Sequence, residues 1–186
     1  VLAMMREDPA ALERGLQAIG ETLAAYARNC IDAGADGIFY ATTVATKPLM
    51  SVEECRRFQR PHDLPILESA RTAPFNIMHV CGDHTHFDEF LDYPVSVFSW
   101  ATTPGNPRLA EVQKRTGRAV LGALPGKPQI GGMSPAALVG CARVSLAETG
   151  GTHHLLGPDC SINAGTPDAL LHAVGDAVAA SSPAAR

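Results

Sequence analysis

The chain has 186 residues, of which 46% are hydrophobic and 18% charged, and this suffices for one sizeable core in an ordinary globular domain. A net charge of −4 without a basic run excludes the electrostatic footprint of a nucleic-acid or anionic-membrane binder, so small molecules are the expected partners. No apolar stretch approaches the roughly 20 residues that span a bilayer, and the first residues lack the order of a signal peptide, which favours a cytoplasmic location.

The first predicted element is a helix over residues 9–33, with Asp8 placed to cap its start. Apolar side chains recur at steps of three and four along this helix, and we expect them to form the face that packs on a core. The members of this stripe are Leu12, Leu16, Ile19, Leu23, Tyr26 and Cys30.

A short buried strand is expected next, in the segment GADGIFYA at residues 34–41. Ser51 and Glu54 then form the capping-box pattern, in which each side chain satisfies a free amide of the other at the start of a helix. Pro61 interrupts this helix, and a further helical piece leads into the strand FNIMHV, at residues 75–80.

The rest of the chain alternates short apolar strands with helices that open on a capping residue followed by proline. These helices begin near Asn106, Ser134 and Thr166, and the strands are VSVFS, AVLGA and HHLL. The sequence therefore predicts five strands joined through helices by short loops, that is, βα units, a parallel sheet and a single α/β domain over residues 1–186.

A candidate metal site follows from the strand at residues 75–80. Side chains of an extended segment alternate between faces, so His79 and Cys81 project to the same side with Val80 turned away. Cys160 lies just beyond the last predicted strand. If the strands that lead to Cys81 and Cys160 are neighbours in a parallel sheet or barrel, three nitrogen and sulfur ligands meet at the same end of it. Three protein ligands with one open coordination position are the pattern of a catalytic zinc site. Beyond these ligands the sequence does not single out a catalytic residue; Lys47, Arg108 and Lys127 lie in or near loops that could hold an acidic substrate, although solvated surface charges are commoner.

Other histidines and cysteines have ordinary explanations. The odd count of five cysteines at scattered spacings favours reduced thiols over a disulfide framework. His84 and His86 could ligate in place of the proposed residues, although solvated loop histidines are commoner. Asp83 could orient His79, but an aspartate after glycine is more often a turn residue. Three cysteines fall at helical positions, where a small buried hydrophobe is the usual role: Cys30, Cys55 and Cys141.

The order of these motifs resembles the C-terminal part of the uroporphyrinogen decarboxylase superfamily. The resemblance rests on GADGI, HVCGD, the helix around NPRLAEVQKRTG, and GPDCSINAGTP at the opening of the last helix. It covers nearly the whole chain but only about the C-terminal half of a family member. It implies the C-terminal portion, about five βα units, of a (β/α)₈ barrel without its first strands, either because the chain is truncated or because a partner supplies them.

Two chemistries occur in that superfamily. The decarboxylases use no metal and typically show G-H-G near the last strand, where this sequence reads GPDC. The corrinoid-linked methyltransferases pass a methyl group from a methylcobamide to a thiol such as coenzyme M, and carry H-x-C and a distant cysteine as zinc ligands. His79, Cys81 and Cys160 match that pattern one by one. The resemblance therefore implies a zinc-dependent methyltransferase, with the corrinoid either free or on a partner protein.

Two alternatives stay open at the level of sequence. One is a uroporphyrinogen decarboxylase-like carboxy-lyase that removes acetate carboxyl groups from a tetrapyrrole in porphyrin biosynthesis. The other is a non-catalytic remnant or binding module, since a chain without the first strands could be inactive alone. Missing strands would also leave open sheet edges and uncovered apolar surface, so we expect a homo-oligomer.

Overall fold

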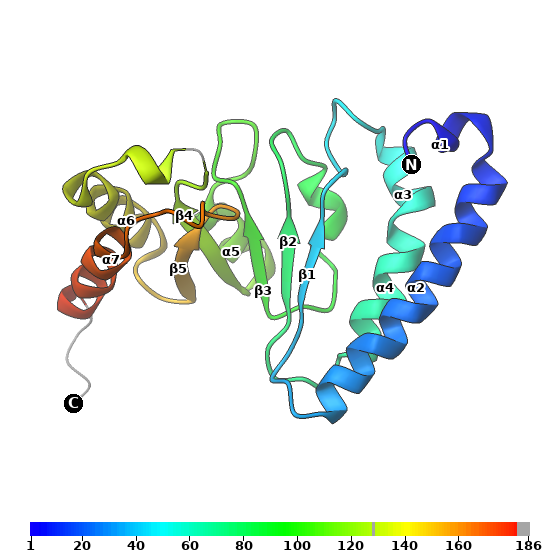
Figure 1. The fold of residues 1–186 in the computed structure, drawn as a ribbon, viewed down its shortest axis with the longest axis horizontal. Coiled ribbons are helices and arrows are strands. Elements are labelled where there is room, and N and C mark those ends of the chain that lie inside the picture. The colour runs from blue at the N-terminus through cyan, green and yellow to red at the C-terminus, as the bar shows by residue number, and fades with distance from the viewer. Residues whose placement is uncertain (128, 182–186) are drawn as a thin grey trace. The chain divides into compact units, whose positions relative to one another are not determined.

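The computed structural model describes residues 1–127 and 129–181 and contains two compact units, Val1–Ser99 and Trp100 onward. The described strands form one five-stranded sheet in the order β1-β2-β3-β4-β5 (Figure 1). The pair β1 and β2 is parallel, as is the pair β4 and β5. The bounds are β1 Phe39–Thr42, β2 Ile77–Val80, β3 Val97–Trp100, β4 Ala119–Leu124 and β5 His154–Pro158.

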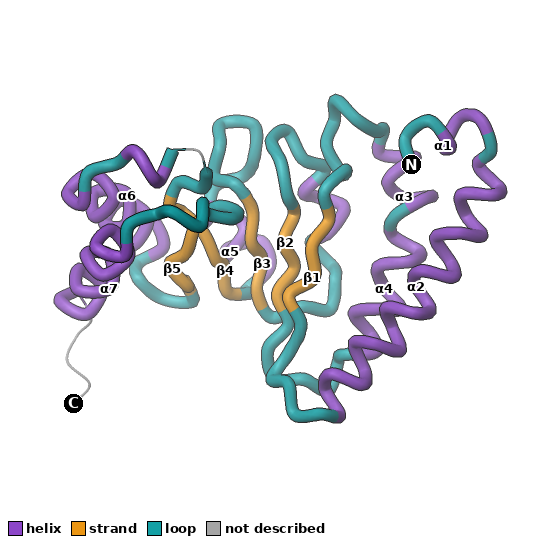
Figure 2. The backbone as a smooth tube through the Cα atoms, in the orientation of Figure 1, coloured by secondary structure: helices purple, strands orange, loops and turns teal. Residues whose placement is uncertain are grey.

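Helices follow the strands along the chain, as the predicted α/β fold requires (Figure 2). In the first unit they are α1 Met4–Glu7, α2 Pro9–Asp32, α3 Val52–Phe58, α4 Arg60–Ser69 and the 3₁₀ helix η1 Phe87–Phe90. In the second unit they are α5 Leu109–Thr116, the 3₁₀ helix η2 Ile130–Gly132, α6 Pro135–Thr149 and α7 Asp168–Ser181. Within the described part of the chain, no helix combines the length and apolar character needed to cross a bilayer.

Most helix ends follow the predicted local signals. The Asp8 carboxylate accepts a hydrogen bond from the Ala11 amide at 2.9 Å, and Ser51 and Glu54 form the full capping box of α3. The expected cap at Asn106 is wrong, because α5 begins at Leu109 and the Asn106 side-chain amide instead donates to the Ala101 carbonyl at 2.9 Å. Short-range capping patterns therefore locate most of the helix starts. The exception is α5, where Asn106 bonds within the loop and the helix begins three residues later.

The expected core face of α2 is only partly right. The buried positions of this helix are Leu12, Gly20 and Ala27. A Cβ at Gly20 would lie 3.6 Å from the His62 side chain on α4, so the two helices approach closely through small residues. Half of the expected stripe is exposed, namely Ile19 at 57%, Leu23 at 40% and Tyr26 at 65%, whereas Leu16 and Cys30 are half-buried.

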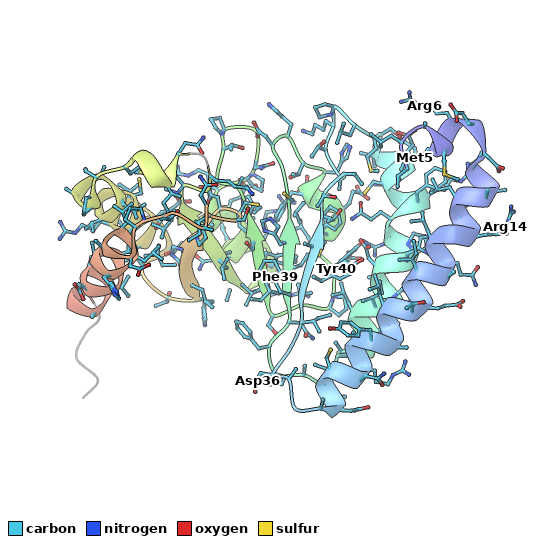
Figure 3. All side chains as sticks on the ribbon, in the orientation of Figure 1. Met5, Arg6, Arg14, Asp36, Phe39 and Tyr40 are labelled. Carbon is cyan, nitrogen blue, oxygen red and sulfur yellow. The ribbon has the colours of Figure 1, made fainter. Side chains whose placement is uncertain are left out.

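A buried polar network joins β1 to α4 in the first unit. Phe39 and Tyr40 project from opposite sides of β1 (Figure 3). The Tyr40 hydroxyl donates to the Asp63 carboxylate at 2.5 Å, and the buried Tyr93 hydroxyl donates to the same group at 3.1 Å. Burial raises the pKa of Asp63, and hydrogen bonds from Tyr40, Gln59 and Tyr93 oppose that shift without cancelling it. Periodicity alone did not indicate this network.

The raised pKa of Asp63 predicts a pH dependence of stability. As pH rises above the ordinary carboxyl value of 3.8, the unfolded chain loses the proton first while the folded chain keeps it. The free energy of unfolding therefore falls with rising pH until the raised folded pKa is passed. We expect Asp63→Asn to remove this slope in urea titrations at a series of pH values. Asp36→Asn, at an exposed site, should keep it, and equal slopes for wild type and Asp63→Asn would contradict the assignment.

The second unit has its own core. Apolar residues of β4, η2, α6 and α7 form one buried cluster, whose members are Leu124, Ile130, Leu138, Ala142, Leu170 and Val174. The fully buried Trp100 lies at the end of β3, and its indole N–H donates to the Pro107 carbonyl at 2.9 Å. This core supports the loops that follow β4 and β5.

Candidate metal centre

His79 is held in a defined orientation on β2. It pairs in register with Ala41 of β1 and is only 5% exposed. Its Nδ1 lies 3.0 Å from the Ser99 hydroxyl, and its ring stacks on Phe39 with a centroid separation of 5.7 Å. When Nδ1 carries the proton and donates to Ser99, Nε2 has the lone pair that a metal ion requires.

Cys81 extends the same strand by one residue. Its amide donates to the Thr42 carbonyl at 3.0 Å, which continues the ladder between β1 and β2 and keeps the two-residue alternation from His79. The chain then turns at Gly82, whose φ of +108° suits glycine, and a Cβ there would lie 2.8 Å from a Thr46 methyl group. Local geometry therefore places Cys81 at a sharp strand-to-loop turn.

Cys160 belongs to the second unit and follows β5 by two residues. It is exposed, and its Sγ lies 3.9 Å from the Ser161 hydroxyl. The preceding amide, that of Asp159, donates to the Leu124 carbonyl at 2.7 Å and so carries the β4–β5 pairing one step beyond the strand. The predicted position just past the last strand is confirmed.

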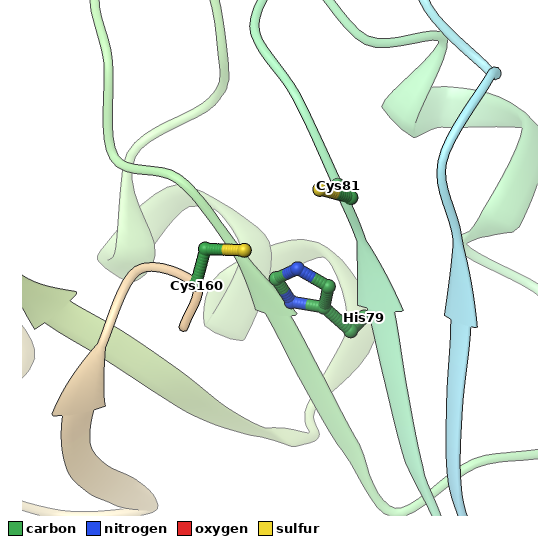
Figure 4. Close-up of side chains that lie close together, drawn as sticks. All are labelled: His79, Cys81 and Cys160. Carbon is green, nitrogen blue, oxygen red and sulfur yellow. The ribbon is translucent and has the colours of Figure 1, made fainter. Parts of the chain in front are cut away.

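His79, Cys81 and Cys160 form a possible metal-binding group. One ligand atom from each of His79, Cys81 and Cys160 can be chosen so that all lie within 4.8 Å of one another (Figure 4). Donors around a single tetrahedral zinc ion lie roughly 3.5–3.8 Å apart, given its bond lengths of about 2.0–2.3 Å. One imidazole and two thiols are also ligand types that zinc prefers, and three of them leave a fourth position open. This donor set fits zinc.

Comparison with known proteins identifies the family. The family model described as uroporphyrinogen decarboxylase (URO-D) matches residues 1–181. The chain belongs to this family. A solved structure described as a methyltransferase from Methanosarcina mazei is similar in fold, with a TM-score of 0.79 and 21% sequence identity.

That similarity covers 96% of this chain and 52% of the methyltransferase, so this URO-D chain spans about half the length of that protein. Among curated proteins, no sequence matches significantly. The family resemblance read from the motifs is confirmed, and a five-stranded parallel α/β sheet that matches half of a longer chain is consistent with a partial (β/α)₈ barrel.

The other candidate ligands of the URO-D chain have separate roles. His84 is exposed, has a φ of +49°, and donates its amide to the Asp83 carboxylate at 2.8 Å, so Asp83 acts as a turn residue. His86 is not a solvated loop histidine, because it is buried with Nε2 2.7 Å from the Met50 carbonyl oxygen. Of the three helical cysteines, only Cys55 is fully buried, and burial raises the pKa of its thiol to about 11.

Two residues that make contacts next to the proposed ligands were not predicted from the sequence. Ser99, which is 1% exposed, lies on β3 opposite the His79 ring, and its hydroxyl within an apolar strand was a usable signal. Asp159 precedes Cys160, and its carboxylate accepts hydrogen bonds from the loop after β3 and from β4. The latter contact joins segments far apart in the chain and has no local signature.

Proposed function

We propose that this URO-D family member is a zinc-dependent methyltransferase, which moves a methyl group from a methylated corrinoid to a small thiol. The observation that carries the proposal is the close grouping of His79, Cys81 and Cys160, with ligand atoms within 4.8 Å. The fold similarity to a methyltransferase is consistent with this chemistry. The proposed partners are the thiol substrate and, where the corrinoid is protein-bound, a corrinoid protein.

The ligand types suit alkyl transfer to sulfur. A free thiol has a pKa near 8.5 and is mostly protonated at neutral pH, whereas the thiolate is the nucleophile. A bound zinc ion would strongly lower the pKa of a thiol that occupied its open coordination position. Two cysteine ligands offset the positive charge of such a site, so a substrate thiolate there keeps more electron density than it would beside neutral ligands.

The residues of the chain prepare the site for that reaction. Ser99 orients the His79 ring, Phe39 covers one face of it, and Gly82 sets the turn after Cys81. In the overall reaction a carbon–sulfur bond forms and the cobalt–carbon bond breaks. The electron pair of the broken bond stays with the corrinoid, and the thiol proton passes to solvent.

A second candidate is a decarboxylase, because the matching family model carries that description over residues 1–181. Its reaction would release CO₂ from acetate side chains of a tetrapyrrole and would need no metal. The sequence at the end of β5 is Gly157, Pro158, Asp159 and Cys160, without the histidine expected for that branch. This difference places the decarboxylase second.

One experiment separates the two functions. The chain is purified under reducing conditions, dialysed against a weak chelator and analysed for zinc by mass spectrometry. It is then incubated either with methylcobalamin and a small thiol or with uroporphyrinogen. We expect about one zinc per chain and formation of the methyl thioether. A chain that retains no zinc but releases CO₂ from uroporphyrinogen would overturn the methyltransferase proposal.

A further inference from the structure

We infer that Asp159 is a positioning residue, which fixes Cys160 by fastening its loop to β4 and to the segment that follows β3. The inference rests on the proposed function in one respect, since Cys160 matters for zinc only if it is a ligand. The loop contacts themselves lie entirely within the second unit and stand independently of any metal.

The Asp159 carboxylate accepts hydrogen bonds on both oxygens. Oδ2 accepts from the Thr102 amide at 2.9 Å, and Oδ1 accepts from the Ala123 amide at 2.8 Å. The Thr102 hydroxyl donates to the same carboxylate, at 3.1 Å from Oδ1 and 2.9 Å from Oδ2. A single side chain therefore ties the loop after β5 to two other segments, through hydrogen bonds to a charged acceptor that are stronger than neutral ones.

Backbone contacts hold the residues on either side of Cys160. The Asp159 amide donates to the Leu124 carbonyl at 2.7 Å, and the Ser161 carbonyl accepts from the Lys127 amide at 3.0 Å. A Cβ at Gly126 would lie 3.4 Å from the Cys160 amide nitrogen, so the loops after β4 and β5 run in close contact. With both neighbours fixed, the Cys160 side chain has little freedom beyond its own rotamers.

Strand β4, which donates a hydrogen bond to Asp159, has an unusual backbone. Ala123 has a φ of +84°, a conformation that alanine rarely adopts, and the preceding Gly122 has a φ of +155°. The Ala123 amide in this conformation donates to Asp159 Oδ1. A Cβ at Gly122 would lie 3.4 Å from the same oxygen and 3.3 Å from the Trp100 carbonyl oxygen. Strained backbone persists where surrounding contacts over-determine it, and such positions gather at functional sites.

The test compares Asp159→Asn with Asp176→Asn in the whole chain. Asparagine has nearly the same shape but replaces one acceptor oxygen with an NH₂ group, which must face a donor at this site. Asp176 is exposed on α7, so its substitution removes the same charge away from the loop. Amide hydrogen exchange is measured in the metal-free chain for the peptide covering residues 159–163, and the zinc dissociation constant is measured by competition with a chromophoric chelator.

We expect Asp159→Asn to speed exchange in that peptide about tenfold or more and to weaken zinc binding by roughly 10- to 100-fold, a range typical of outer-shell partners. Asp176→Asn should change neither quantity. Thr102→Val, which removes the hydroxyl but keeps the amide donor, should give a smaller change in the same direction. This variant also decides the question if Asp159→Asn does not fold.

The outcomes separate this inference from the proposed function. Exchange that stays at the wild-type rate in both Asp159→Asn and Thr102→Val would overturn the anchoring role. Faster exchange without any change in zinc affinity would overturn the inference that Asp159 positions Cys160 for zinc, because Asp159 would then serve loop stability alone. A wild-type chain that binds no zinc would remove the proposed function, while the exchange rates would still decide whether Asp159 holds the loop.

Discussion

Replacing Cys160 with alanine is expected to abolish retention of zinc and, with it, methylation of the thiol. The substitution removes one of three donors whose ligand atoms lie within 4.8 Å, and it leaves one imidazole and one thiol. The loss of affinity should exceed the roughly 10- to 100-fold that substitution of an outer-shell partner costs. Zinc content after dialysis, measured by mass spectrometry, gives the primary result, and thioether formation gives the second.

Cys141→Ala provides the matched control. Cys141 is half-buried on α6 and packs against the core cluster of the second unit, and it is not one of the three proposed ligands. Its substitution should cost about 1 kcal/mol in the free energy of unfolding and leave the zinc content unchanged. Equal zinc content in Cys160→Ala and Cys141→Ala would show that Cys160 is not a ligand.

Self-association is the second large effect that we expect. The apolar side chains Ile19 and Tyr26 are 57% and 65% exposed on α2, and Leu23 lies between them. Ile19 and Leu23 also line a groove of about 400 Å³ that reaches β1 and α4. An apolar surface of this kind favours association in water, so we propose that copies of the chain associate through α2.

Sedimentation velocity over a range of concentrations tests this proposal. Wild type should form oligomers, and the double substitution Ile19→Glu with Tyr26→Glu should shift the chain to monomer. A control that adds the same two charges at Ala18 and Ala25, which are exposed on α2 outside the stripe, should leave association intact. Glutamate is a good helix former, so either variant should keep α2. A wild-type chain that stays monomeric at every concentration would exclude the α2 interface.

The residue pattern by itself determined most of the helices and strands and placed two of the three candidate ligands on one face. Alternating short strands and capped helices identified the α/β fold, since capping boxes and proline positions act over three or four residues. The two-residue period of a strand placed His79 and Cys81 on one face. Family motifs added the expectation that Cys160 joins them, and the three residues form a possible metal-binding group.

Only the tertiary structure decided which surfaces and polar groups meet. The stripe of α2 satisfies helical periodicity, yet close packing against α4 selects the face with Gly20 and Ala27 because small residues permit the shorter approach. Asp63 is hydrogen-bonded to Tyr40, which lies 23 positions away in the sequence, and Asp159 is hydrogen-bonded to Thr102, which lies 57 positions away. Such contacts depend on strand order and register, which set the distance between remote segments and leave no periodic trace in the sequence.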